Sequence, residues 1–274
     1  MSGATAARKV LEVLGAFGPD NRRLSLSEIG RRTGLALSTA HRVVAELESW
    51  GALERDADGS YCIGLRMYEV GVLAPRGTAL RDAAMPFMED LYEVTHEVVQ
   101  LAVREGTELV FTERLAGHTS VGVHTQVGLR FPMPASGAGL VLLAFAPVDV
   151  QEAVLAGPLR QFTPKTLVDP VELRTVLAEI RRTGIATSDR QVTMDSFSVG
   201  APIRDPSGDV VAAVSLVVHA DSYDVGVLSA LVGTAARGIS RSLAGASALQ
   251  AAAEPLRPLH RRAEPSHPAP SARA

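Results

Sequence analysis

Residues 22–64 read RRLSLSEIGRRTGLALSTAHRVVAELESWGALERDADGSYCIG. In this stretch, Ser25 and the following Glu28 have the spacing of a capping box, which predicts that a helix begins here and runs to about Arg32. Gly34 then supplies a residue that adopts positive φ easily, as the turn into a second helix often needs. The first half of the stretch is therefore expected to fold as two helices joined by a tight turn.

The helix after that turn is expected to start near Ser38 and to have two different sides. One side is apolar and consists of Ala40, Val43, Val44 and Leu47. The opposite side consists of Ser38, His41, Arg42 and Ala45. Its hydroxyl, imidazole and guanidinium groups suit contacts with base edges and phosphates, and its small residues permit close approach to DNA. An ordinary amphipathic surface helix is the alternative interpretation.

Charge is divided unevenly along the stretch. Between residues 22 and 42 there are five arginines against Glu28 alone, whereas between residues 44 and 60 there are five acidic residues against Arg55. Asp56-Ala57-Asp58-Gly59 predicts a hairpin turn between two short strands. With a further amphipathic helix predicted over residues 5–17, this order is typical of a winged helix-turn-helix that places one helix in the DNA major groove.

The partner predicted for this module is double-stranded DNA. The residues expected to contact it lie on the two helices and the hairpin: Arg31, Arg32, Ser38, Thr39, His41, Arg42 and Arg55. Arg42 is the first choice for a base or phosphate contact, and Ser38 and Thr39 are expected to donate to phosphates. For Arg55, a contact with the DNA backbone and a solvated charge are both open.

The composition of the chain sets limits on its class. Its 274 residues suffice for about two domains. The net charge of −3 predicts no general affinity for nucleic acid, so DNA binding must come from a local basic surface. The single cysteine, Cys62, excludes an intrachain disulfide framework. Because neither a signal peptide nor a membrane-spanning stretch is predicted, we expect a cytoplasmic protein.

The chain divides into four parts by pattern. The winged module occupies residues 1–64, and apolar helical patterns that Pro75-Arg76-Gly77 interrupts make residues 65–95 linker helices. These helices are either a dimer seam or packed within one subunit. Residues 96–245 form a second domain, and the alanine- and proline-rich residues 246–274 are predicted to be a disordered tail.

In the second domain, short β-branched runs alternate with helical patterns. Strands are predicted at 98–103, 109–112, 121–124, 198–203 and 210–218, and helices at 135–146, 171–183 and 225–243. An antiparallel sheet with helices packed around it is an α+β arrangement, and such a sheet can leave a pocket on one face.

No pattern for catalysis or metal binding stands out. The histidines have no HExxH or CxxC companions, no GxSxG element occurs, and the glycines at 137 and 139 lack the context of a dinucleotide fingerprint. We therefore predict no catalytic residue, no metal and no cofactor. An enzyme and a sensor that binds a ligand without DNA remain the alternative classes.

Over about residues 5–244 the chain resembles the IclR family of bacterial transcriptional regulators. The resemblance rests on the segment at 34–64, on SGAGLVLLAF at 136–145, on VGAPIRDPSGDVVAAVSLVV at 199–218 and on GISRSLAG at 238–245. It implies a homodimer or tetramer with paired winged helices and a GAF-like effector-binding domain. In such regulators a small metabolite, often a carboxylate or an aromatic acid, changes the affinity for a palindromic operator.

The resemblance also implies which residues line the effector pocket: Ser136, Gly137, Ala138, Asp189, Ser198 and Ser215. Backbone amides at the glycine-rich helix start suit a carboxylate. The chain departs from the family pattern at Pro134, Leu140, Arg190, Gln191 and Val217. With Leu140 and Val217, the pocket is expected to prefer a more apolar ligand.

Overall fold

The computed structural model describes residues 5–117, 120–123, 125–221 and 224–253. Its first domain is a three-helix module with a small sheet, whose elements are α1 (Ala6–Leu14), β1 (Arg23–Leu24), α2 (Leu26–Thr33), α3 (Leu37–Trp50), β2 (Leu53–Arg55) and β3 (Tyr61–Ile63). The hairpin β2–β3 is the predicted wing, and Gly59 in its turn has a φ of 85°. Strand β1, which was not predicted, pairs with β3 and completes the sheet in the order β1-β3-β2.

The linker helices are α4 (Leu65–Gly71) and α5 (Pro75–Thr95). The expected interruption lies between them, but α5 already begins at Pro75 and not after Gly77. The physical reason is that proline suits the first turn of a helix, where its missing N–H has no intrahelical partner. None of the residues of α4 is buried, whereas α5 buries Leu80, Ala84, Met88 and Leu91. The two linker helices therefore differ in what they pack against.

The second domain is built on one antiparallel sheet. Its strands are β4 (Val98–Glu105), β5 (Glu108–Leu115), β6 (Arg130–Pro132), β7 (Ala186–Asp189), β8 (Ser196–Arg204) and β9 (Val210–His219). They lie in the order β6-β5-β4-β9-β8-β7. The remaining elements are the 3-10 turn η1 (Met133–Ala135) and the helices α6 (Gly137–Ala144), α7 (Val148–Ala156), α8 (Pro170–Thr183) and α9 (Val225–Ala253).

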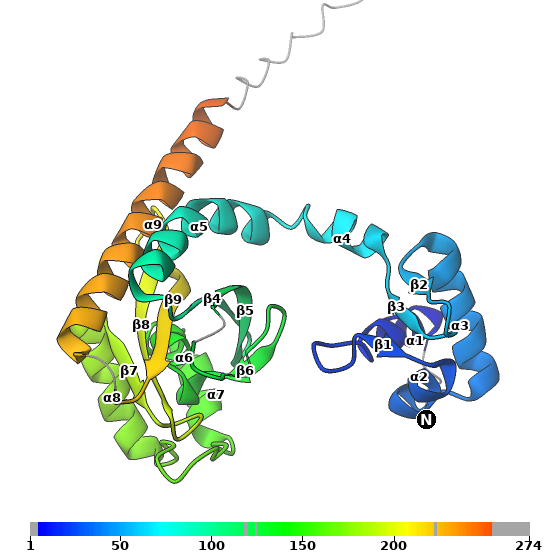
Figure 1. Cartoon of the computed structure of the whole chain (residues 1–274), viewed down its shortest axis with the longest axis horizontal. Coiled ribbons are helices and arrows are strands. Elements are labelled where there is room, and N and C mark those ends of the chain that lie inside the picture. The colour runs from blue at the N-terminus through cyan, green and yellow to red at the C-terminus, as the bar shows by residue number, and fades with distance from the viewer. Residues whose placement is uncertain (1–4, 118–119, 124, 222–223, 254–274) are drawn as a thin grey trace, which may run out of the picture.

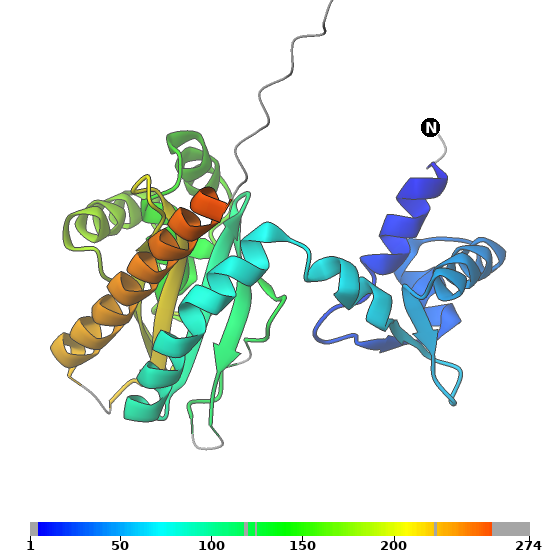
Figure 2. The same cartoon turned by 90° about the horizontal axis from the view of Figure 1, so that it is seen from above.

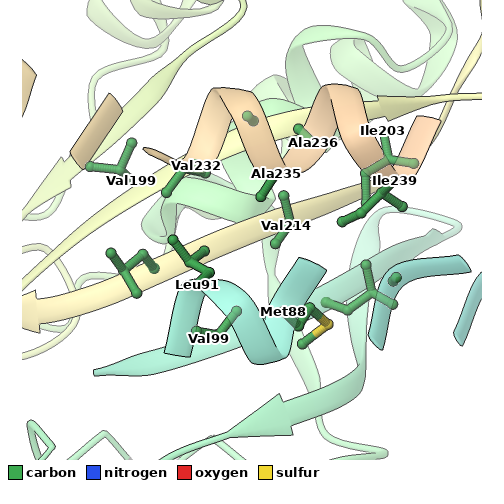
Figure 3. Packing of buried hydrophobic residues seen from close by; sticks show 14 of the residues in the cluster. Met88, Leu91, Val99, Val199, Ile203, Val214, Val232, Ala235, Ala236 and Ile239 are labelled. Atoms are coloured by element: carbon green, nitrogen blue, oxygen red, sulfur yellow. The ribbon is translucent and has the colours of Figure 1, made fainter. Parts of the chain in front are cut away.

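Helices cover both faces of this sheet. Figures 1 and 2 show α5 and α9 side by side over one face, with α6, α7 and α8 on the other side. Figure 3 shows the core between the sheet and the helices α5 and α9, where Met88 and Leu91 of α5 and Val232 and Ile239 of α9 pack on the sheet. Leu140, Leu173 and Leu177 anchor α6 and α8 to the opposite face. The α+β architecture predicted from the sequence is confirmed.

Two predictions about this domain were wrong, and three of its elements were missed. Residues 121–123 form no strand; Val121 and Val123 are instead buried against Val98 and Val217, and His124 lies outside the described residues. The short β-branched segment at 121–123 is therefore a buried loop, because tertiary packing overrides local β-propensity. The strands β6 and β7 and the helix α7 were not predicted.

The second wrong prediction concerns the end of the domain. Helix α9 continues to Ala253, past the predicted start of the tail at residue 246, because the alanine-rich segment has high helix propensity. The rest of the predicted tail, residues 254–274, lies outside the described residues. Within the part of the chain that the structure describes, no helix is long and apolar enough to cross a membrane.

Candidate functional site

The helix-turn-helix is held by the predicted local signals. Ser25 N donates to Glu28 Oε2 over 2.8 Å and Glu28 N donates to Ser25 Oγ over 3.3 Å, which is a complete capping box. The bond from the Ser25 backbone lowers the pKa of Glu28. The capping box therefore stabilises α2 at neutral pH, and its contribution is lost as the pH falls through that lowered pKa. At the other end, Gly34 with a φ of 68° turns the chain into α3.

Helix α3 presents the predicted polar face to solvent. Ser38, His41 and Arg42 are exposed and Thr39 is half-buried, while Ala40, Val43, Val44 and Leu47 are buried beneath them. The N-cap residue, Ala36, makes no side-chain hydrogen bond to the helix. The amides at the start of α3 therefore lack a side-chain cap, and a phosphate can provide one.

The arginines of this domain fall into two groups. Arg23 forms an ion pair with Asp56 (2.9 Å), Arg32 donates to the side chain of Asn21, and Arg55 lies over the ring of Tyr61 at 5.6 Å. By contrast, Arg31 and Arg42 form no hydrogen bond or ion pair with any described residue. These two guanidinium groups are thus available to an external anion without breaking an existing contact.

A cavity of about 330 Å³ lies on the face of the sheet opposite α5 and α9. Alternation along the strands decides which side chains reach it, since neighbouring residues point to opposite faces. Val199, Val214 and Leu216 face α5 and α9, so Ser198, Ser215 and Val217 face the cavity. Gln100 of β4 is paired with Ser215 of β9 in the register of the sheet and lies on the same side.

Hydroxyl and amide groups cover the sheet side of the cavity. Ser215 Oγ lies 3.4 Å from Gln100 Oε1, and Gln100 Nε2 donates to the hydroxyl of Thr125. Ser188 Oγ donates to the carbonyl of Ala135 over 2.8 Å. Thr193, which also lines the cavity, donates to Asp195 and thereby lowers the pKa of that carboxyl. These hydroxyl and amide groups of the cavity lining can therefore donate and accept hydrogen bonds, and they carry no charge.

Three aromatic side chains form another part of the cavity lining, and two of them, Phe111 and Phe131, come from the sheet strands β5 and β6. Phe131 is stacked on Phe162 with ring centroids 5.0 Å apart, and Phe111 lies 6.5 Å from Phe131. The guanidinium carbon of Arg160 lies 4.5 Å from the centroid of the Phe162 ring. Among the described residues that line the cavity, Arg160 alone carries a charge. The cavity is thus an apolar and aromatic space with neutral polar groups on one side and a single cation.

Three of the six predicted pocket residues, Ser136, Ser198 and Ser215, line this cavity. Gly137 and Ala138 are buried and do not line it. The Gly137 amide donates to Ser198 Oγ over 3.0 Å, so it is already used within the protein. Asp189 is exposed and pairs with Arg190 over 2.8 Å. Gly137, Ala138 and Asp189 therefore lie outside the lining of this cavity.

The position of Asp189 outside the cavity lining has a simple origin. Because side chains alternate along β7, the inward position is Ser188 and Asp189 points to the other face. Leu140, expected to make the pocket more apolar, is instead fully buried beneath it in the core. Sequence reasoning missed the aromatic residues and Gln100; the alternation in residues 98–103 was the signal that could have identified Gln100.

The Ser198 hydroxyl is expected to be structural. We predict that Ser198→Ala lowers the free energy of unfolding by about 1–3 kcal/mol, because it leaves the buried amide of Gly137 without its partner. Ser229→Ala, which removes an exposed hydroxyl bonded only to its own helix, serves as the control. Urea unfolding of both variants checks this. Equal midpoints for Ser198→Ala and the unaltered protein would contradict it.

Within the described residues, no group of three or more histidine, cysteine, aspartate and glutamate side chains is placed to hold a metal ion. Cys62 is half-buried, and burial raises the pKa of its thiol. At neutral pH the thiol is therefore protonated.

Models of two known domains match the chain. Residues 6–57 match the IclR helix-turn-helix domain, and residues 74–241 match the domain described as bacterial transcriptional regulator IclR C-terminal. Among curated proteins, the chain is 32% identical to the HTH-type transcriptional regulator KipR of Bacillus subtilis over 70% of its own length and 78% of the relative's. It is 31% identical to the HTH-type transcriptional repressor AllR of Escherichia coli, over 78% and 80% of the two chains.

Solved structures give the same result. An IclR homologue from Microbacterium hydrocarbonoxydans, complexed with 4-hydroxybenzoate, superposes with a TM-score of 0.85 and is 37% identical; the match covers 88% of this chain and 100% of that one. The IclR protein of Thermotoga maritima superposes with a TM-score of 0.70 at 28% identity, covering 87% and 98%.

Proposed function

Because the chain belongs to the IclR family of bacterial transcriptional regulators, we propose that it binds a palindromic operator and that a small aromatic carboxylate modulates this binding. Its helix-turn-helix is a DNA-binding domain and its C-terminal domain is an effector domain. The observation that carries the proposal is that the chain combines two features: an exposed polar and basic face on α3 in one domain, and an aromatic cavity in the other. As part of this proposal, the protein acts in the bacterial cytoplasm, where the DNA is.

On the DNA side, the proposed contacts come from α2 and α3. Arg42 and Ser38 point outward from the recognition helix, and Arg31 adds a charge at the end of α2. These groups have different tasks, since base contacts specify the sequence and phosphate contacts position the protein. His41, Thr39, Arg32 and Arg55 complete the proposed set. Arg32 and Arg55 must exchange their present contacts for DNA.

On the effector side, the shape and chemistry of the cavity support an aromatic acid. A flat ring can lie against the phenylalanine side, where aromatic pairs contribute beyond the buried area. A cavity of about 330 Å³ is within the size range of small-molecule sites. A homologue 37% identical to this chain is complexed with 4-hydroxybenzoate, which makes this compound the first effector to test.

We further propose that the chain is at least a homodimer, with α4 in the contact between subunits. Leu65 (64%), Tyr68 (63%) and Leu73 (77%) are largely exposed on or just after α4, and Leu11 of α1 is exposed as well (67%). An exposed apolar patch of this kind marks an interaction surface. A palindromic operator needs two recognition helices about 34 Å apart, or a multiple of that, which a single subunit does not present.

The dimer contact leads to a prediction. Tyr68→Glu is expected to shift the protein toward monomer and to weaken operator binding, because it places a charge in the apolar contact. Glu69→Gln, on the same helix, is the matched control and should leave the dimer intact. Sedimentation velocity and DNA anisotropy on both variants check this. A Tyr68→Glu protein that stays dimeric would place the contact elsewhere.

The effector would act by population shift: it binds one arrangement of the two domains better than the other. A typical coupling of ~1–3 kcal/mol changes operator affinity about 5- to 150-fold. The linker helices α4 and α5 are the proposed route, since they connect the two domains and α5 packs on the effector sheet. A crosslink between these helices that leaves the effector response unchanged would rule out this route.

Fluorescence anisotropy tests the proposal as a whole. The protein is titrated onto DNA from upstream of its own gene and onto scrambled DNA, across salt concentrations, with and without 4-hydroxybenzoate. We expect tighter binding to the upstream fragment, a steep salt dependence and a change in affinity on adding the compound. Equal, weak binding to both fragments at every effector concentration would favour a sensor without DNA, and turnover of the compound would favour an enzyme.

A further inference from the structure

The cavity holds one feature that the resemblance to the family did not identify. Two of the amides at the helix start that was expected to bind a carboxylate are already used within the protein, because the Gly137 amide donates to Ser198 Oγ and the Gly139 amide donates to Ser136 Oγ. Asp189 lies outside the cavity. Arg160, in the loop after α7, is the charged residue that does line it. An anionic effector therefore needs a counter-charge that the expected residues do not supply.

Arg160 is suited to that role by its surroundings. Its guanidinium lies over the Phe162 ring at 4.5 Å, which orients the plane of the group at the cavity edge. It is exposed and forms no hydrogen bond or ion pair with a described residue. The nearby Glu108 is engaged by Arg130 at 3.7 Å and is not the partner of Arg160. The N–H donors of Arg160 are thus available, and the guanidinium can bind an anion without breaking an existing hydrogen bond or ion pair.

We propose that Arg160 binds the carboxylate of the effector at the edge of the cavity and so selects aromatic acids over their neutral analogues. The effector ring then lies beside Phe131 and Phe111, and the group opposite the carboxylate reaches Gln100 and Ser215 on the sheet. A guanidinium matches a carboxylate with two parallel hydrogen bonds, so it recognises both charge and shape. This inference rests on the proposed effector class and adds the residue that recognises the charge.

The test compares two ligands of similar shape, one with a charged carboxylate and one with a neutral amide in its place. Calorimetry measures binding of 4-hydroxybenzoate and 4-hydroxybenzamide to the full chain and to Arg160→Gln, Arg160→Lys and Arg104→Gln. Arg104, on β4 and away from the cavity lining, is the control for losing an arginine. We expect Arg160→Gln to lower affinity for the acid about 10- to 100-fold while leaving the amide unchanged. Arg160→Lys should recover part of the affinity for the acid.

Each other outcome has a defined meaning. If Arg160→Gln weakens both ligands equally, Arg160 shapes the cavity through Phe162 and does not recognise charge, which overturns the inference. Unchanged affinity for the acid overturns it as well. If the unaltered protein binds neither compound although it binds its operator, the effector class is wrong and the inference fails with it. The regulator function itself then still stands on the DNA measurement.

Discussion

Replacing Arg42 with alanine is expected to lower operator affinity about 5- to 150-fold, or ~1–3 kcal/mol, and to relax specificity at one base pair. Arg42 is exposed on α3 and forms no hydrogen bond, ion pair or ring contact with a described residue, so its removal should delete the proposed DNA contact and little else. The free energy of unfolding should therefore change by no more than about 0.5 kcal/mol. Anisotropy on the operator and on single-base variants measures the effect.

Arg31→Ala is the matched comparison for Arg42. Arg31 lies in the last turn of α2, is exposed and likewise forms no hydrogen bond or ion pair with a described residue. If it contacts a phosphate, its removal should weaken binding to all DNA sequences about equally and reduce the salt slope by about one. Wild-type binding by both variants would mean that another face of the domain docks on DNA.

The second large effect is expected from Gly200→Ala. A Cβ at residue 200 would lie 2.5 Å from the carbonyl oxygen of Gly137 and 2.6 Å from its carbon. Both are backbone atoms of the α6 start, so relief requires moving the helix and not a side chain. Overpacking of this kind costs about 1–3 kcal/mol, which for a chain of this size lowers Tm by about 2–12 °C. The bond between Gly137 and Ser198 should be lost as well, and effector binding with it.

Gly245→Ala is the control for that experiment. Gly245 lies in α9, and a Cβ there would meet no atom within 4 Å. Since alanine favours a helix over glycine by up to ~1 kcal/mol, this variant should be neutral or slightly more stable. Differential scanning fluorimetry and calorimetry with 4-hydroxybenzoate compare the two. Native stability of Gly200→Ala would show that α6 does not need this close approach to β8.

The DNA-binding domain was predictable nearly to the residue, and the reason is that its signals are local. The capping box at Ser25 and Glu28, the turn at Gly34 and the hairpin turn ending at Gly59 each act within a few residues. The amphipathic pattern of α3 identified its buried side correctly. The missed strand β1 has two residues and exists because it pairs with β3, which is distant in sequence.

The effector domain was predictable in outline and less so at its site. Its class followed from alternating strands and helices, yet the short strands β6 and β7 carry too few residues to show a period. The three serines that line the cavity were named by resemblance, as was Asp189, which the alternation of β7 turns outward. The sequence could not predict that Phe131, Phe162 and Arg160 lie together at the cavity, because they come from a strand and a loop that only the tertiary structure brings into contact.

Local patterns in the chain thus suffice for the helix-turn-helix, the identity of its exposed face and the α+β class of the second domain, because short-range hydrogen bonds and side-chain periodicity set them. Which residues line the cavity of the second domain could be learned only from the folded chain. Strand register decides which of two neighbouring residues faces inward, and packing of the loop at Arg160 against β6 brings a cation to an aromatic wall. Contacts between segments far apart in sequence, such as the bond from the Gly137 amide to Ser198 Oγ, decide which polar groups are already used within the protein.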